Sequence, residues 1–405
     1  MGILNNLLDS ASKGAEGRPF ATVKFGEVAW NSKKAGIYII DVNMGINGDA
    51  STCVIVLKGN HAEVSKNKVE ISSDFEKIKI GAKVEVSLGY TGKAPSIKKD
   101  VSPVFKGFVS DMEIEIDYDK SVTVTVTCMD GKIWLMASNE TKIFKNITSY
   151  SNAIKAIYSS NSSKFYGLKV GKTPNLKTPI YMCDESYYNF CVRAAKITGK
   201  YFFVFLGVLY FIDLKGVVSK TKVISPSQNV RKVTFRASPF GIPKFVEVKS
   251  INDKDINKPL ETKVSKVEGG VGSGKDTLGM ISSLNSTITV YDETVTSVKE
   301  AQNLANSILE QRSLNLAQTE LEIEGDPKIE LASKLKLSGF GIPIDNSYVI
   351  TGIQHYCNFD SGEYTTNIHL SAYKYTPQGG GIGGALSGAT GALSGAVGAL
   401  SSLLK

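Results

Sequence analysis

The sequence predicts a mainly β protein with an α/β insertion. In residues 19–135 and 231–376, apolar and polar residues alternate with a period of two between breaks of Gly, Pro, Asn and Asp. This pattern is typical of antiparallel strands in a barrel or sandwich. Residues 136–230 show helical spacing instead. Since 405 residues exceed one ordinary core, several domains are expected.

Composition favours a globular protein without nucleic-acid or membrane function. The chain is 42% apolar and 21% charged, and its net charge of +8 comes almost entirely from lysine. Specific nucleic-acid sites favour arginine forks, so the lysines indicate a solvated surface. No run is apolar enough for stable membrane insertion, and residues 1–8 lack the features of a secretory signal. The five scattered cysteines predict neither disulfides nor a zinc site.

Residues 1–18 are predicted to be an N-terminal arm, and residues 19–135 the first barrel-like domain. The arm has apolar residues at helical spacing and is expected to dock on another protein surface. In the domain, Ile114 and Ile116 alternate with acidic residues, which predicts a hairpin around Asp119-Lys120 with one apolar and one polar face. The expected strands are 37–42, 53–57, 84–88, 105–109, 112–118 and 122–128.

Residues 136–230 are predicted to form an α/β helix–hairpin domain. Thr148 or Ser149 is placed to cap a first helix. A second helix is expected over about 185–198, ending at Gly199, and a strand hairpin over 201–212. The inward stripe of the second helix, spaced three and four apart, is Tyr187, Phe190, Cys191, Ala194 and Ile197.

The second barrel-like domain is expected over residues 231–376. It includes a Gly-, Ser- and Lys-rich linker over 251–287 and a helix over 297–313. Ser297 and Glu300 predict a capping box at the start of this helix. Its expected apolar face consists of Val298, Ala301, Leu304, Ala305, Ile308 and Leu309.

The C-terminal tail, residues 377–405, contains a seven-residue repeat. Leu386, Leu393 and Leu400 recur every seven residues, and Ala or Leu follows three positions later. Each glycine costs about 1 kcal/mol in a helix, so a stable lone helix is not expected. One hypothesis is that three tails associate, or that each packs on a partner such as a tape measure protein through 379–405. A mobile Gly/Ser tail and a membrane-inserting peptide are the alternatives.

The sequence predicts no catalytic, cofactor-binding or metal-binding residue. Residues 269–276 approach a P-loop, but Asp276 stands where Ser or Thr is needed. His355 and His369 are placed to face each other across a hairpin, so metal or acid–base use is conceivable, although a satisfied or surface histidine is favoured. His61 completes no metal motif. Asp117 and Asp119 are interpreted as solvated or lumen-facing acids rather than a glycosidase pair.

Three blocks of motifs, in this order, resemble one family. The first has Leu88-Gly89-Tyr90 before Phe105-x-Gly107-x-Val109, the second is the helix and aromatic hairpin, and the third runs from Gly325-Asp326-Pro327 through Tyr348-Val349-Ile350 and His355 to Gly362-x-Tyr364-Thr365. They are similar to baseplate hub proteins of contractile injection systems. That family includes phage tail hubs, phage late control proteins and the hub part of the type VI secretion valine-glycine repeat proteins.

The resemblance implies a structural protein rather than an enzyme. Hubs of this family are homotrimers in which each subunit contributes two related tube-like barrels, so that a pseudo-sixfold ring joins a hexameric inner tube to a trimeric spike. The expected partners are therefore an inner tube or tube-initiator protein, a separate spike protein and other baseplate proteins. Assembly is expected in the bacterial cytoplasm, within a phage tail, a tail-derived bacteriocin (tailocin) or an extracellular injection particle. A tail-associated cell-wall hydrolase and a host-surface-binding tail protein are the alternatives.

Overall fold

A computed structural model describes most of the chain between residues 17 and 372. The arm before residue 17, His61, Asp119, the P-loop-like segment 269–276 and the tail 377–405 lie outside the described residues. For residues 62–65, 68–71 and 98–100 only the backbone is described. The described ranges are 17–32, 36–46, 48–58, 62–65, 68–71, 78–91, 98–117, 122–176, 179–214, 221–238, 242–252, 255, 257–265 and 286–372.

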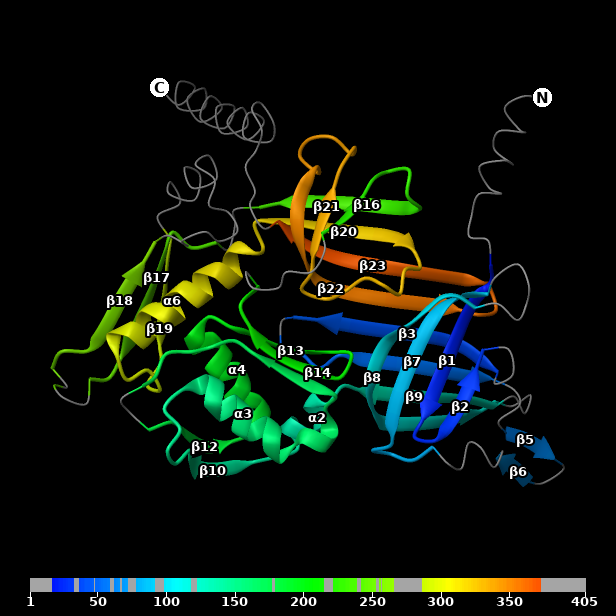
Figure 1. The fold of residues 1–405 in the computed structure, drawn as a ribbon, viewed down its shortest axis with the longest axis horizontal. Coiled ribbons are helices and arrows are strands. Elements are labelled where there is room, and N and C mark those ends of the chain that lie inside the picture. Colours follow the sequence, from blue (N-terminus) through cyan, green and yellow to red (C-terminus); the bar gives the residue numbers. More distant parts are fainter. Residues whose placement is uncertain are drawn as a thin grey trace, which may run out of the picture.

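A large sheet dominates the fold (Figure 1). Its 13 strands follow the order β16-β20-β23-β22-β3-β4-β9-β8-β7-β1-β2, with β21 added to β22 and β15 to β21. The strands from the first part of the chain are β1 (Pro19–Phe25), β2 (Val28–Asn31), β3 (Ile37–Gly45), β4 (Thr52–Lys58), β7 (Lys83–Thr91), β8 (Lys98–Ile116) and β9 (Val122–Met129). Those from the last part are β15 (Lys222–Ile224), β16 (Val230–Ala237), β20 (Ala317–Glu324), β21 (Lys334–Leu337), β22 (Asn346–Asn358) and β23 (Glu363–Ala372).

The described strands form an open sheet and no closed barrel, which differs from the predicted barrels. The reason is that β22 changes partner along its length: its first part pairs with β21, and residues Gly352 to Asn358 pair with β3. This second pairing joins the two strand-rich stretches edge to edge. The segments 105–109 and 112–118 also differ from the prediction, because they belong to one strand, β8, with an irregularity between Val109 and Asp111.

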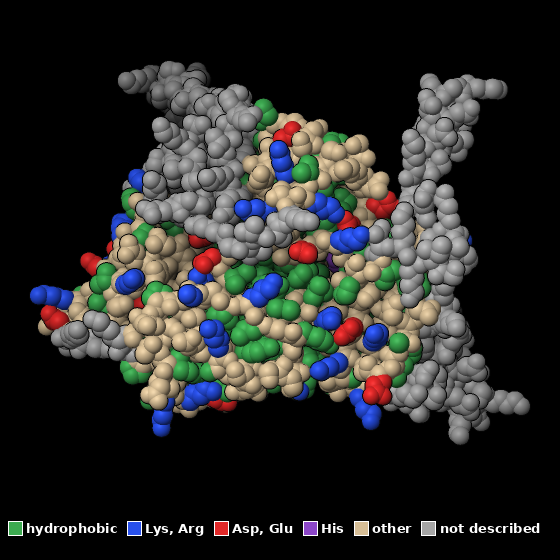
Figure 2. Space-filling view, viewed as in Figure 1, with side chains coloured by type: hydrophobic (Ala, Val, Ile, Leu, Met, Phe, Trp, Pro, Cys, Tyr) green, Lys and Arg blue, Asp and Glu red, His purple; other side chains and the backbone are tan. Residues whose placement is uncertain are grey.

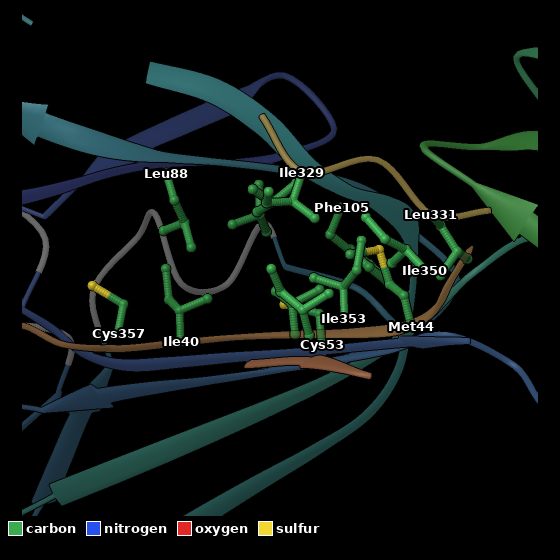
Figure 3. Packing of buried hydrophobic residues seen from close by; sticks show 14 of the residues in the cluster. Ile40, Met44, Cys53, Leu88, Phe105, Ile329, Leu331, Ile350, Ile353 and Cys357 are labelled. Carbon is green, nitrogen blue, oxygen red and sulfur yellow. The ribbon is translucent and has the colours of Figure 1, made fainter. Parts of the chain in front are cut away.

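One hydrophobic core lies between the two parts of the sheet. Figure 3 shows Ile329 and Leu331, from the segment after β20, reaching between side chains of both strand-rich stretches. Leu88 and Phe105 come from the first stretch and Ile350 from the last, and all five side chains are buried. The segment after β20 therefore serves as a shared layer of packing.

The helix–hairpin region has a separate core beside the sheet. Of the two predicted caps, Ser149 caps the first helix, and Gly199 ends the second in the left-handed conformation (φ 69°), as predicted. The second helix begins at Tyr187 rather than near 185, because Ser186 caps it. All five residues of the predicted inward stripe are buried. Its elements are α2 (Lys132–Met136), β10 (Glu140–Ile143), α3 (Tyr150–Ser160), η2 (Ser162–Lys164), β11 (Gly167–Val170), β12 (Tyr181–Glu185), α4 (Tyr187–Thr198), β13 (Tyr201–Phe205) and β14 (Val208–Ile212).

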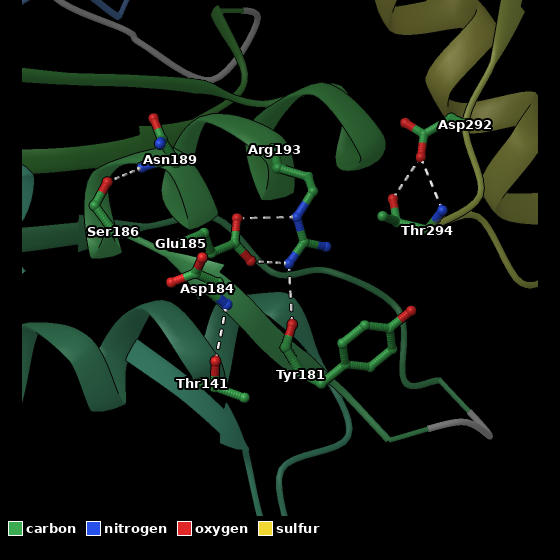
Figure 4. A network of polar contacts seen from close by, with 9 residues as sticks. All are labelled: Thr141, Tyr181, Asp184, Glu185, Ser186, Asn189, Arg193, Asp292 and Thr294. Carbon is green, nitrogen blue, oxygen red and sulfur yellow. Dashed lines mark hydrogen bonds and ion pairs between the residues drawn. The ribbon is translucent and has the colours of Figure 1, made fainter. Parts of the chain in front are cut away.

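Polar contacts fix α4 against the neighbouring strand. Arg193 forms an ion pair with Glu185, and its guanidinium also donates a 2.9 Å hydrogen bond to the carbonyl of Tyr181 (Figure 4). The Ser186 hydroxyl accepts a hydrogen bond from the backbone N–H of Asn189 and so caps the helix. These contacts position α4 against β12 within the helix–hairpin region.

A buried ion pair joins this region to the sheet. Lys132 and Asp130 are almost fully buried, with 3.7 Å between Nζ and Oδ2. Asp130 also accepts backbone hydrogen bonds from Ser51 and Lys132, each of 2.8 Å, and Lys132 Nζ donates to the carbonyls of Gly48 and Asp49. Burial raises the pKa of Asp130 and lowers that of Lys132, and each charge is held by the other.

A third small unit packs α6 on a three-stranded sheet. The unit comprises β17 (Phe245–Ser250), β18 (Leu260–Val264), β19 (Thr287–Tyr291) and α6 (Val298–Ser313), and β18 lies within the segment predicted as a linker. Ser297 caps α6, but the Glu300 carboxylate accepts from the Thr296 N–H at 2.9 Å, one residue before the cap. Val298 is 53% exposed, contrary to prediction, because Val295 occupies the core before the helix begins.

The remaining strands, β5 (Ala62–Ser65) and β6 (Lys68–Ile71), form a separate pair. On the face shown in Figure 2, basic side chains are spread among acidic and apolar ones and gather in no single patch. In the described part of the chain, no helix is long and apolar enough to cross a bilayer.

Candidate functional site

Two groups of four strands in the large sheet have the same topology. The first group is β3, β4, β8 and β9, and the second is β16, β20, β22 and β23. Each group lies in the sheet in the order first, second, fourth and third strand, namely β3-β4-β9-β8 and β16-β20-β23-β22. We call these groups block 1 and block 2. The same small unit therefore occurs twice in the chain.

The two blocks also share their irregularities in register. The first strand of each block shifts against the second, between Ile37 and Ile39 in block 1 and between Val230 and Lys232 in block 2. The third strand shifts against the fourth, between Val109 and Asp111 in block 1 and between Ile350 and Gly352 in block 2. Because bulges are specific features of a strand pair, this agreement aligns the blocks residue by residue.

Together the blocks form a continuous sheet with one buried and one polar face. Successive side chains of a strand point to opposite faces, so the registers identify the residues on each face. Most residues on the polar face are half-buried or exposed, and the buried Thr365 and Ser371 are polar as well. From β16 to β8 these residues include Lys232, Thr234, Arg236, Glu322, Glu320, Gln318, Asn367, His369, Gln354, Asp41, Asn43, Thr52, Val54, Thr127, Thr125, Thr123, Asp111, Glu113 and Glu115.

A ladder of hydrogen bonds crosses the polar face where the two blocks meet. Asn367 donates to Gln354 Oε1 at 3.3 Å, and Gln354 donates to Asp41 Oδ1 at 3.0 Å. Asn43 donates to the same Asp41 oxygen, also at 3.0 Å. These amides and the carboxylate fix one another, so this part of the surface is preorganised.

The two candidate histidines lie on opposite faces of the sheet. His369 pairs with Gly352 on the polar face, whereas His355 pairs with Thr366 and is 1% exposed in the core. The side-by-side arrangement considered from the sequence is therefore wrong, because three register positions and the sheet itself separate the rings. No group of three or more potential metal ligands occurs among the residues that the structure describes.

The core histidine belongs to a neutral hydrogen-bond network. His355 Nδ1 lies 3.1 Å from the hydroxyls of both Tyr364 and Thr366. Burial lowers the pKa of His355 to about 4, and Asp326 offsets only part of that effect. The neutral ring therefore accepts hydrogen bonds near pH 7, and its placement suits a structural role.

The motifs at Gly325 and Tyr364 contact each other in space. A Cβ atom added to Gly325 would lie 2.1 Å from the Tyr364 ring, so only glycine fits this approach. The Asp326 N–H donates to Thr366 Oγ1 at 2.9 Å, and the Tyr90 hydroxyl donates to the carbonyl of Gly325 at 3.1 Å. Sequence reasoning found these motifs by resemblance but not the clamp that they form.

A cavity of about 500 Å³ lies where the polar face meets α4 and α6. Its lining includes Lys196, Lys200, Tyr201 and His369, and no carboxylate occurs among the lining residues that the structure describes. Lys200 is engaged by Asp213 at 2.5 Å.

Solved structures with a similar fold come from tail proteins. The 43 kDa tail protein of prophage MuSo2 from Shewanella oneidensis is 15% identical with a TM-score of 0.62, over 87% of this chain and 98% of that one. A tail protein from Neisseria meningitidis MC58 is 13% identical with a TM-score of 0.62, over 87% and 96%. At these identities the similarity shows a shared fold.

A third similar structure is an Escherichia coli component of the type VI secretion system, described as structurally similar to the T4 bacteriophage tail proteins gp27 and gp5. It is 11% identical with a TM-score of 0.50, over 88% of this chain and 78% of that one. No curated protein matches the sequence. One family model, described as the Alg8 N-terminal domain, matches residues 23–358. Because this match spans well over half of the chain, the protein belongs to the Alg8 N-terminal domain family.

Proposed function

We propose that this protein is the structural hub of a contractile tail or injection particle, a trimeric adaptor between a hexameric inner tube and a trimeric spike. The observation that carries the proposal is the four-strand block that occurs twice in one open sheet. Three copies of a chain with two equivalent blocks present six equivalent units to one side. The same three copies present threefold symmetry to the other side.

The polar face supports this role. A sheet that continues from copy to copy turns one face toward the ring axis, and the face lined with threonines, amides and charged groups is the one suited to a water-filled channel. The buried face then lies outside the channel. The tail proteins and the type VI component with the same fold are consistent with such a part of a tail.

The test is mass measurement of the purified chain, alone and mixed with the tube and spike proteins of its own particle. A trimer that binds both partners is expected, and class averages of the complex should show threefold symmetry at the spike end and sixfold symmetry at the tube end. A chain that stays monomeric with both partners present would refute the hub. Clearing of peptidoglycan by the purified chain in a zymogram would refute the structural assignment in favour of a hydrolase.

A further inference from the structure

We propose that the outer part of β8 in one copy pairs with β16 of the next copy, in the register by which β22 pairs with β3 within one chain. The interaction partner is a second copy of this protein, and the inference rests on the proposed function because it specifies how the ring of copies closes. The β8 edge of the eight-strand polar face in one copy would thus contact the β16 edge of the same face in the next copy.

The outer part of β8 has a vacant side within the described residues. The first part of β8 pairs with β7 up to Phe108, whereas Asp111 to Ile116 pair with β9 alone. Ile114 and Ile116 are 40% and 48% exposed, although they share a face with the buried Val124 and Val122 opposite them. The apolar face of the sheet thus extends to this edge, and long strand edges of this kind bind further strands.

The other end of the polar face has a complementary edge. Strand β16 pairs only with β20 among the described strands. It carries Arg231, Lys232 and Arg236, whereas the outer part of β8 carries Asp111, Glu113 and Glu115. Opposite charges on directly paired strands are stabilising, and like charges are not. A basic edge therefore fits an acidic edge of another copy.

The internal repeat supplies the register. β22 is the block 2 equivalent of β8, and β3 is the block 1 equivalent of β16. Within the chain, Gln354 lies opposite Asn43, and His355 lies opposite Val42. The shared bulges align β8 with β22 and β16 with β3. In this alignment, the pair of Gln354 and Asn43 corresponds to Glu113 opposite Arg236 of the next copy.

The same conversion places Ile114 opposite Phe235 of the next copy, and Ile116 opposite Val233. The charged pair falls on the polar face, and both apolar pairs fall on the core face. A single register thus pairs opposite charges on the polar face and apolar side chains on the core face.

The strand directions permit this contact by rotation alone. Seven antiparallel junctions connect the eight strands from β16 to β8, so these two edge strands run in opposite directions. Rotation about an axis along the strands therefore brings β8 of one copy antiparallel to β16 of the next. Such a head-to-tail interface closes into a ring when the rotation closes.

Charge reversal tests the contact. Glu113→Arg and Arg236→Glu should each weaken assembly with the tube and spike proteins by about tenfold or more, since each places like charges opposite each other. The double variant Glu113→Arg/Arg236→Glu should recover most of the loss. Glu320→Arg, on the same face but away from both edges, is the matched control and should assemble as wild type.

Cysteine crosslinking tests the register independently. In a Cys183→Ser background, Glu113→Cys with Arg236→Cys should give disulfide-linked oligomers on mild oxidation of the assembled complex. Glu115→Cys with Arg236→Cys, shifted by two residues on the same face, should link much less. The interface would be overturned if the charge variants assembled as well as the wild type and the cysteine pairs did not crosslink. Because the wild type would still assemble in that case, the hub proposal would stand. Failure of the wild type to assemble would instead refute the proposed function.

Discussion

Acidification should destabilise the fold through one buried histidine. His355 is 1% exposed, and its Nδ1 lies 3.1 Å from two uncharged hydroxyls, so a charged ring has no carboxylate in contact with it. Its pKa falls from 6.5 to about 4 in the folded state. Because the unfolded chain binds the proton more readily, the contribution to stability is fully present above pH 6.5 and is lost as the pH falls toward 4.

The size of this effect follows from the pKa difference. A shift of about 2.5 units at 1.36 kcal/mol per unit corresponds to about 3 kcal/mol between pH 7 and pH 4. His355→Gln keeps a polar group at the site and removes the titration. The variant should be less stable than wild type at pH 7, since its amide fits the network less well. On going to pH 4, the unfolding free energy of the variant should rise by about 3 kcal/mol relative to that of wild type.

The assay is urea unfolding of both proteins at intervals from pH 7 to pH 4, followed by fluorescence. Carboxylates titrate in the same range, but they do so in both proteins and cancel in the difference. The matched control is His369→Gln, which removes a histidine from the exposed polar face and leaves the buried network around His355 intact. A stability difference between His355→Gln and wild type that stays constant with pH would show that His355 does not titrate as its burial requires.

Three substitutions test other parts of the fold by thermal and urea unfolding. Gly325→Ala forces a Cβ into the Tyr364 ring and should cost about 1–3 kcal/mol or more, whereas Gly362→Ala, which meets no neighbouring atom, tests the backbone effect of losing a glycine alone. Lys132→Met leaves Asp130 buried without its cation and should cost about 3–5 kcal/mol, an effect that shrinks at low pH because protonated Asp130 needs no counter-charge. Ser297→Ala removes the cap of α6 and should cost about 1 kcal/mol, and equal stability would contradict the cap.

Local elements were predictable because local rules determine them. The cap at Ser149, the end of α4 at Gly199 and the inward stripe of that helix depend on neighbouring residues only. The face of α6 was less predictable because Val295, which precedes the helix, competes with Val298 for the same core. Periodicity inside a helix does not show which residue before the cap folds back onto it.

The long-range organisation of the sheet was not predictable from alternation. The junction at Gln354 and Asn43 pairs residues about 300 positions apart, and period-two patterning carries no information on the neighbouring strand. The irregularity near Ile350 also changes which residues face the core, which is why His355 and His369 were placed together from sequence but lie apart. Motif resemblance located Gly325 and Tyr364, but their contact depends on the folded sheet.

The chemistry of the two block junctions leads to a last prediction about salt. Within the chain, the junction is held mainly by amides, with Gln354 bonded to Asp41, and folding of a single chain needs no long-range attraction. The proposed junction between copies instead places Glu113 against Arg236, and charges of this kind speed association and select the register. Salt screens charges over a Debye length of about 10 Å at 0.1 M, and less as salt is added.

Raising the salt from about 0.05 M to about 0.5 M should therefore slow assembly of the wild type severalfold, as measured by light scattering after mixing with the partner proteins. The urea midpoint of the isolated chain should change little, because its own junction is mostly neutral. The double variant with both charges exchanged should keep the same salt dependence, since it keeps the attraction. Assembly rates that do not respond to salt, in a wild type that still assembles, would show that the acidic and basic edges do not meet.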